Sequence, residues 1–148
     1  LGMSKSSDTT GERKYEFLAA KVLSDSRKGS RSKAAISIDG VGKEAEGRGV
    51  GPIDALFEAI LKMVDFGGRL NEFKAKALID EEKAAGVVDI VWEDDSGKLW
   101  HGQGISADII AASGMALIDI LNEVDKENVS DREVNRQSFV ETIIKTNK

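Results

Sequence analysis

The residues with the clearest chemical potential in this chain are the glycines of two similar motifs. Gly47-Arg48-Gly49-Val50 and Gly102-Gln103-Gly104-Ile105 begin 55 positions apart, at 47 and at 102, and each precedes a run with helical spacing of apolar residues. Glycine turns at helix starts expose backbone N–H groups near the positive end of the helix dipole. We therefore expect two turns that can bind a small anion such as a carboxylate.

Few other residues suggest chemistry. The only histidine, His101, stands beside Trp100 without a nucleophile motif, and the chain has no cysteine. The acidic pairs at residues 81–82 and 94–95 have the composition of solvent-exposed turns. Neither glycine motif continues as a dinucleotide fingerprint or a phosphate-binding loop. We expect no catalytic residue and no metal site in this chain.

The composition predicts one globular domain. The chain has 148 residues, of which 41% are hydrophobic, and a net charge of -5. The negative charge argues against non-specific nucleic-acid binding, and the basic stretch at residues 27–33 has the glycine and serine content of a hairpin loop. No apolar run approaches the roughly 20 residues that span a bilayer, and the lack of cysteine fits a reducing compartment. We expect a cytoplasmic protein that binds neither nucleic acid nor membrane.

The elements that must position the glycine motifs follow from apolar periodicity. Alternation predicts strands at residues 34–38, 73–79, 88–92 and 98–103, and helical spacing predicts helices at 53–64 and 109–124. Residues 15–23 fit either a helix or a buried strand. The pattern therefore indicates an α+β fold of two strand-strand-helix units, with antiparallel strands and both helices packed on one face.

The two ends differ from this repeat. Residues 1–11 are small and polar, and Leu1-Gly2 before Met3 resembles a cloning remnant, so we expect a disordered or cloning-derived tail there. Residues 12–124 form the predicted domain. Residues 125–148 are charged with a modest apolar pattern, which predicts either a short terminal helix or an irregular tail.

Three segments together carry a family resemblance. They are Gly49-Val50-Gly51-Pro52-Ile53-Asp54-Ala55-Leu56-Phe57-Glu58-Ala59-Ile60, Ala84-Ala85-Gly86-Val87-Val88, and Gly102-Gln103-Gly104-Ile105-Ser106-Ala107-Asp108-Ile109-Ile110-Ala111-Ala112-Ser113. In order and spacing they resemble the C-terminal regulatory domain of the α-isopropylmalate synthase and citramalate synthase family. The resemblance covers residues 15–124.

The resemblance implies an allosteric domain without catalytic residues or a cofactor of its own. In that family a separate N-terminal barrel holds a divalent metal and condenses acetyl-CoA with a 2-oxo acid. The regulatory domain pairs about a two-fold axis and binds the end-product amino acid, which is L-leucine for isopropylmalate synthases and L-isoleucine for citramalate synthases. The alternative is a homodimerisation module without a ligand, in which the glycines serve only close packing.

The resemblance also carries effector-lining positions over to this sequence. At some of them plain core packing is an equally good interpretation, namely at Leu70, Phe73 and Ala77. Glu72-Phe73 replaces the family's usual Asp-Tyr, which removes a hydroxyl from the expected pocket wall and leaves the identity of the effector open. The predicted effector-binding residues are Gly49, Gly51, Ile53, Leu70, Phe73, Ala77, Ala84, Ile105 and Ser106.

Overall fold

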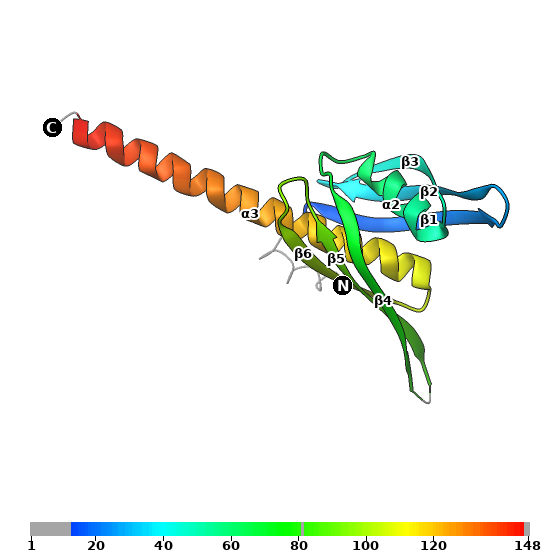
Figure 1. Ribbon diagram of the computed structural model, residues 1–148. Coiled ribbons are helices and arrows are strands. Elements are labelled where there is room, and N and C mark those ends of the chain that lie inside the picture. The colour runs from blue at the N-terminus through cyan, green and yellow to red at the C-terminus, as the bar shows by residue number, and fades with distance from the viewer. Residues whose placement is uncertain (1–12, 81, 147–148) are drawn as a thin grey trace.

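The computed structural model describes residues 13–80 and 82–146, which form two consecutive units of three strands and one helix (Figure 1). This confirms the predicted α+β fold with antiparallel strands, although each unit has three strands rather than two. The first unit comprises β1 (Tyr15–Asp25), β2 (Gly29–Ile38), β3 (Val41–Gly49) and α2 (Pro52–Leu61). The second comprises β4 (Arg69–Ile79), β5 (Ala84–Glu93), β6 (Leu99–Ser106) and α3 (Ile109–Thr146).

The strands form two separate antiparallel sheets, and in each sheet the strands lie side by side in the order in which they follow along the chain. The first sheet has the order β1-β2-β3 and the second the order β4-β5-β6. The ambiguous residues 15–23 belong to strand β1, which pairs with β2 from Tyr15 opposite Ile38 to Asp25 opposite Gly29. Short turns join neighbouring strands, such as Asp39-Gly40 between β2 and β3, where both residues have positive φ angles of 53° and 83°.

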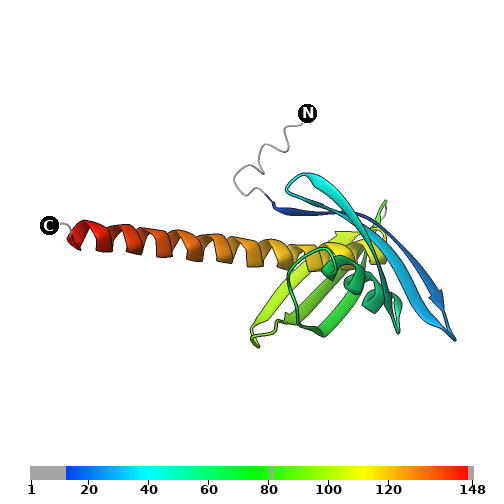
Figure 2. The ribbon, with the colours of Figure 1, turned by 90° about the horizontal axis from the view of Figure 1, so that it is seen from above.

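Both helices lie between the two sheets. Helix α2 packs on β2 and β3, and its Phe57 also meets Trp92 of the second sheet edge to face at 6.2 Å. Helix α3 packs on β5 and β6 and reaches back to β1, where Asn122 bonds to Tyr15. Figure 2 shows the helices with one sheet on each side. We call the sheet face toward the helices the inner face; the apolar residues of the inner faces and helices form one core.

The two glycine motifs are not turns, which corrects the sequence prediction. Gly47 and Gly49 belong to β3, and Gly102 and Gly104 belong to β6. On the inner face, these glycines lie so close to the helix backbones that a side chain has no room. A Cβ on Gly47, for example, would be 2.5 Å from the amide nitrogen of Ala59. Glycine is therefore needed here for close approach of strand and helix, and not for turn geometry.

The structural repeat also differs from the apparent sequence repeat. Gly47 faces the backbone of Ala59, twelve positions later, and Gly104 faces that of Ala116, again twelve positions later. Gly104 is thus the counterpart of Gly47, an offset of 57 residues, from 47 to 104. The sequence motifs instead align Gly47 with Gly102, at an offset of 55. That alignment is two residues short of the structural repeat, which is one inward-facing position along the strand.

Helix α3 continues well beyond the two-sheet body. It is one helix from Ile109 to Thr146, so residues 125–146 extend the second predicted helix without a break (Figure 1). The predicted tail at residues 1–11 lies outside the described residues. Within the described part of the chain, no helix has the length and apolar character needed to cross a membrane.

Candidate functional site

An apolar cavity of about 400 Å³ lies where α3 begins over the second sheet. Small side chains of β4 and β5 form its floor, because alanine and glycine leave the inner face of the sheet shallow. Ile109, in the first turn of α3, closes one side. The lining residues include Ala75, Ala77, Ala84, Gly86, Ala107 and Ile109.

The cavity continues onto an apolar surface that nothing in the described chain covers. The β4–β5 hairpin extends beyond the first turn of α3, so no helix covers the inner face of its outer end (Figure 1). Ile79, which pairs with Ala84 in this hairpin, is 80% exposed. Contiguous exposed apolar surface next to a cavity is typical of a binding site or a protein interface.

Three of the predicted effector residues, Ala77, Ala84 and Ser106, lie together here. Ala77 pairs with Gly86, and Gly86 pairs with Ser106 on its other side, so the three form one row across the sheet. Ala84 lies two residues before Gly86 on the same face, because side chains alternate along a strand. Ala77 and Ala84 both line the cavity. Ser106 ends β6 beside it.

Ile105 lies on the opposite face of the second sheet. It pairs with Val87, and both are one residue out of step with the Ala77, Gly86 and Ser106 row. Its side chain is 54% exposed. The predicted effector residues therefore include positions on both faces of this sheet, and Ile105 does not face the cavity that Ala77 lines.

Leu70 and Phe73 lie nearer the start of β4 and have other neighbours. Leu70 pairs with Trp92 and lines a separate cavity between β4 and α2. Phe73 pairs with Ile90, and its half-buried ring packs against the core. These contacts show that the two side chains contribute to core packing.

The predicted residues of the first unit occupy the matching position on the other sheet. Gly49 completes a row with Ser24 and Ser30, which corresponds to the row that Ser106 completes in the second unit. Here the cavity, of about 350 Å³, is lined by polar residues instead of alanines. Gly51 is the N-cap residue of α2, and Ile53 is half-buried against the core.

The two helix starts differ in what they offer an anion. At α3 the Asp108 carboxylate accepts the Ile110 amide at 2.9 Å, so the helix caps itself. At α2 no side chain caps the start, and Pro52 stands in its first turn. Of the two helix starts, only that of α2 has no side-chain cap within the described chain.

Two titratable groups of the described ranges, Tyr15 and Asp94, have clearly shifted pKa values. Residues 13–80 and 82–146 contain no group of three or more histidine, cysteine, aspartate or glutamate side chains that could hold a metal ion. Burial raises the pKa of the Tyr15 hydroxyl. Hydrogen bonds, first from the Trp100 indole and then from the Ser96 hydroxyl, lower the pKa of Asp94 well below its usual range. Asp94 organises the β5–β6 turn, so this shift reflects turn structure.

The structure adds residues that sequence reasoning missed. Gly86 and Ile109 meet closely at the cavity, since a Cβ on Gly86 would lie 2.7 Å from Cδ1 of Ile109. Ala75 and Ala107 also line the cavity. The density of alanine at residues 75–85, which is unusual for exposed strands, could have indicated Ala75, whereas Gly86, Ala107 and Ile109 lie outside that stretch.

Comparison with known proteins adds a family match. The model of the LeuA allosteric (dimerisation) domain matches residues 3–124. Proteins named 2-isopropylmalate synthase are similar to this chain: that of Thiobacillus denitrificans is 31% identical over 115 residues, which are 78% of this chain and 22% of the relative. Those of Vibrio atlanticus and Yersinia pestis are 33% identical over 91 and 94 residues, covering 62% and 64% of this chain and 17% and 18% of the relatives. The chain thus matches about a fifth of the length of these relatives.

Proposed function

This chain belongs to the LeuA allosteric (dimerisation) domain family, and we propose that it is the effector-binding and dimerisation domain of a 2-isopropylmalate synthase. In this proposal the whole enzyme condenses acetyl-CoA with 2-oxoisovalerate on the cytoplasmic route to leucine. L-leucine binds this domain at the dimer interface and inhibits the enzyme. The similarity to relatives named 2-isopropylmalate synthase supports the choice of enzyme.

The observation that carries the proposal is the alanine-lined cavity at the uncovered end of the second sheet. Its volume of about 400 Å³ exceeds a branched aliphatic side chain, and its floor of Ala77, Ala84 and Gly86 is apolar, with Lys76 the one charged residue in the lining. Burial of such a side chain contributes about 1.5 to 3 kcal/mol. A second copy of the domain that covered the exposed Ile79 would remove the remaining apolar surface from water.

The polar end of the amino acid requires donors for its carboxylate. The uncapped start of α2 at Gly51 supplies backbone N–H groups and the positive end of a helix dipole. We place the leucine side chain in the cavity of one subunit and its carboxylate near the Gly49 to Gly51 segment across the interface. This arrangement makes the effector site incomplete without dimerisation.

Regulation then follows from thermodynamic linkage. If leucine binds one arrangement of the paired domains more tightly, it shifts the population toward that arrangement, and the catalytic part responds to the shift. Allosteric coupling of about 1 to 3 kcal/mol changes affinity by several-fold to more than a hundred-fold.

A second function is favoured by the close glycine packing. Gly47 and Gly104 are explained by contact of strand and helix alone, without a ligand. A dimerisation domain that binds no effector is therefore the competing proposal. L-isoleucine is the competing effector, because Phe73 lacks the hydroxyl that the family's usual tyrosine would place at the pocket wall.

Isothermal titration of the chain with L-leucine, L-isoleucine and L-valine tests the proposal, with D-leucine as the stereochemical control and sedimentation for the mass. We expect saturable binding of L-leucine by a dimer. Ala77→Phe should abolish binding by filling the cavity, whereas Ala19→Phe, at an exposed position of β1, should leave it unchanged. A folded dimer that binds none of the amino acids would support the dimerisation domain without effector.

A further inference from the structure

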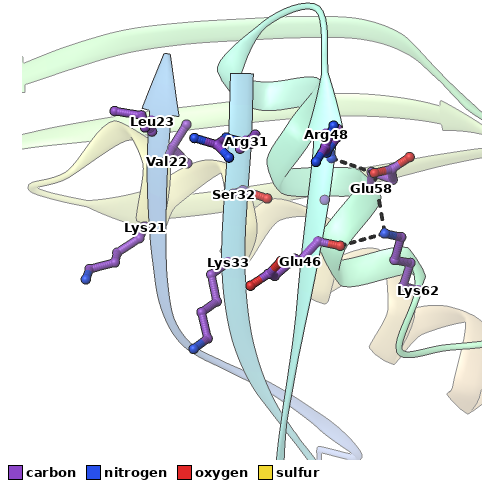
Figure 3. Close-up of a pocket in the computed structure, with 11 residues that line it drawn as sticks. Lys21, Val22, Leu23, Arg31, Ser32, Lys33, Glu46, Arg48, Glu58 and Lys62 are labelled. Carbon is purple, nitrogen blue, oxygen red and sulfur yellow. Dashed lines mark hydrogen bonds and ion pairs between the residues drawn. The ribbon is translucent and has the colours of Figure 1, made fainter. Parts of the chain in front are cut away.

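The outer face of the first sheet, which points away from α2, carries an unusual block of positive charge. Arg31 of β2 pairs directly with Arg48 of β3, and Lys33 of β2 pairs directly with Lys21 of β1. Because Arg31 and Lys33 are two residues apart on one strand, both pairs lie on the same face. All four side chains are exposed. We call these four residues the basic block; Figure 3 shows them across the three neighbouring strands.

This arrangement is unfavourable without a counter-charge. Like charges directly opposite each other in an antiparallel sheet are destabilising, and the basic block has two such pairs in a chain whose net charge is -5. Lys33 has carboxylates beside it, because Glu46 of β3 lies directly opposite it and its ammonium pairs with Glu44 at 3.4 Å. Within residues 13–80 and 82–146, no carboxylate lies in salt-bridge distance of Lys21, Arg31 or Arg48.

A cavity of about 710 Å³ lies against the basic block, and its lining also includes two acidic residues, Glu46 and Glu58. Glu58 of α2 and Lys62, the C-cap residue that follows α2, close it at the open edge of β3 (Figure 3). The Glu58 carboxylate accepts the Arg48 backbone amide at 2.5 Å, and the Lys62 ammonium donates to the Glu46 carbonyl at 2.8 Å. These contacts hold the edge strand in place, and Glu58 and Lys62 also pair with each other at 3.8 Å. The wall is therefore fixed while the guanidinium groups of Arg31 and Arg48 stay available.

We propose that this cavity binds a small molecule that carries a diphosphate group. Guanidinium groups present paired N–H donors that match phosphate oxygens, and two of them on adjacent strands suit two linked phosphates. The neighbouring Leu23, opposite Arg31, gives the remainder of the ligand an apolar contact. The volume lies within the range of small-molecule sites, and the negative charge of the whole chain disfavours a nucleic acid.

This site is separate from the proposed effector site. The basic block lies on the outer face of the first sheet, whereas the alanine-lined cavity, which would hold the leucine side chain, lies on the inner face of the second. The two proposed sites approach each other only at Arg48, which precedes Gly49. The two proposals therefore stand or fall independently. Titration of the Ala77→Phe variant with pyrophosphate separates them, since Ala77 lines only the alanine-lined cavity and that variant should bind pyrophosphate as the unmodified chain does.

Thermal unfolding and titration with inorganic pyrophosphate test the site, with sodium chloride at the same ionic strength as the reference. We expect pyrophosphate to raise the melting temperature beyond the chloride reference and to bind saturably. Arg31→Gln and Arg48→Gln should each weaken binding at least tenfold. Arg132→Gln, which removes the same charge from the exposed side of α3, should not weaken it.

The stability of the variants in chloride distinguishes a binding role from a structural one. If the basic block exists to bind an anion, Arg31→Gln and Arg48→Gln relieve repulsion, and each should melt at or above the temperature of the unmodified chain. Destabilisation by both variants would overturn the proposal, as would equal effects of pyrophosphate and chloride. Tighter binding of a single-stranded oligonucleotide than of pyrophosphate would overturn the assignment to a small molecule.

Discussion

Gly104 of β6 lies directly against the backbone of Ala116 in α3, so close that a methyl group on Gly104 would be 2.8 Å from the Ala116 amide nitrogen. The obstacle is backbone and cannot rotate away, so an added methyl must push the strand and the helix apart. Overpacking of this kind in a core costs about 1 to 3 kcal/mol.

We therefore expect Gly104→Ala to lower the free energy of unfolding by about 1 to 3 kcal/mol, measured by urea denaturation. Gly42→Ala is the matched control, because Gly42 is also a strand glycine, and its added Cβ would only meet Cδ1 of Leu18 at an ordinary 3.9 Å. The control should change stability by less than about 0.5 kcal/mol. Equal stability of the two variants would contradict the close contact of β6 and α3.

Asn122 fixes the start of β1 to α3. Its side-chain oxygen accepts the Tyr15 amide at 2.9 Å, and its side-chain nitrogen donates to the Tyr15 carbonyl at 3.0 Å. The residue is only 7% exposed. Asn122→Ala leaves both backbone groups of Tyr15 without a partner, so we expect a loss of about 1 to 3 kcal/mol in unfolding free energy.

The control for this prediction is Asn128→Ala, six residues later on the exposed part of α3. It removes the same side chain without a recorded contact and should be nearly neutral. Hydrogen exchange gives an independent readout, because the Tyr15 amide should exchange faster in Asn122→Ala alone. Unchanged protection of that amide would show that another group holds the start of β1.

Asp94 makes the stability of the β5–β6 turn depend on pH. One carboxylate oxygen accepts the Lys98 and Ser96 amides at 2.9 Å each, and the other accepts the Trp100 indole N–H at 2.9 Å. These bonds favour the charged form and hold the pKa of Asp94 well below its usual range. Because the folded pKa lies below the unfolded value of about 3.9, the stabilisation is complete above pH 4 and declines as the pH falls below it.

Asp94→Asn should accordingly lower the melting temperature at pH 7, and the difference from the unmodified chain should shrink between about pH 4 and pH 2. Asp95→Asn, next in the same turn, removes the same charge without these hydrogen bonds and serves as the control for the change at pH 7. A constant difference across the acid range would mean that the carboxylate charge is not what stabilises the turn.

Much of the architecture could be predicted from periodicity, because most strands and both helices bury one face and expose the other. Residues 15–23 could not be assigned, since their apolar residues fit both periods and only pairing with β2 selects the strand. The division into two sheets was also out of reach. It depends on α2 and α3 lying between the sheets, which no local pattern specifies.

The site was harder to predict because its glycines and alanines are compatible with either a turn or close packing between a strand and a helix. Glycine before a helix suggested a turn with free N–H groups, yet Gly47 and Gly104 are strand residues that make room for helix backbone. Ala77 and Ala84 could be tied to one cavity only through the strand register. The block of Arg31 and Arg48 is invisible in sequence, where 17 positions separate the two, from 31 to 48.

The projecting part of α3 should be much less stable than the part inside the body. Lys98 contacts Glu127, and beyond that point residues 128–137 are exposed. A helix segment without tertiary contacts depends on its own propensity and opens readily in water. Hydrogen exchange followed by mass spectrometry should show strong protection for residues 110–121 and rapid exchange for residues 128–137. Protection of residues 128–137 as strong as that of residues 110–121 would contradict this. Protection that rises with protein concentration would mean that another chain covers the projecting helix.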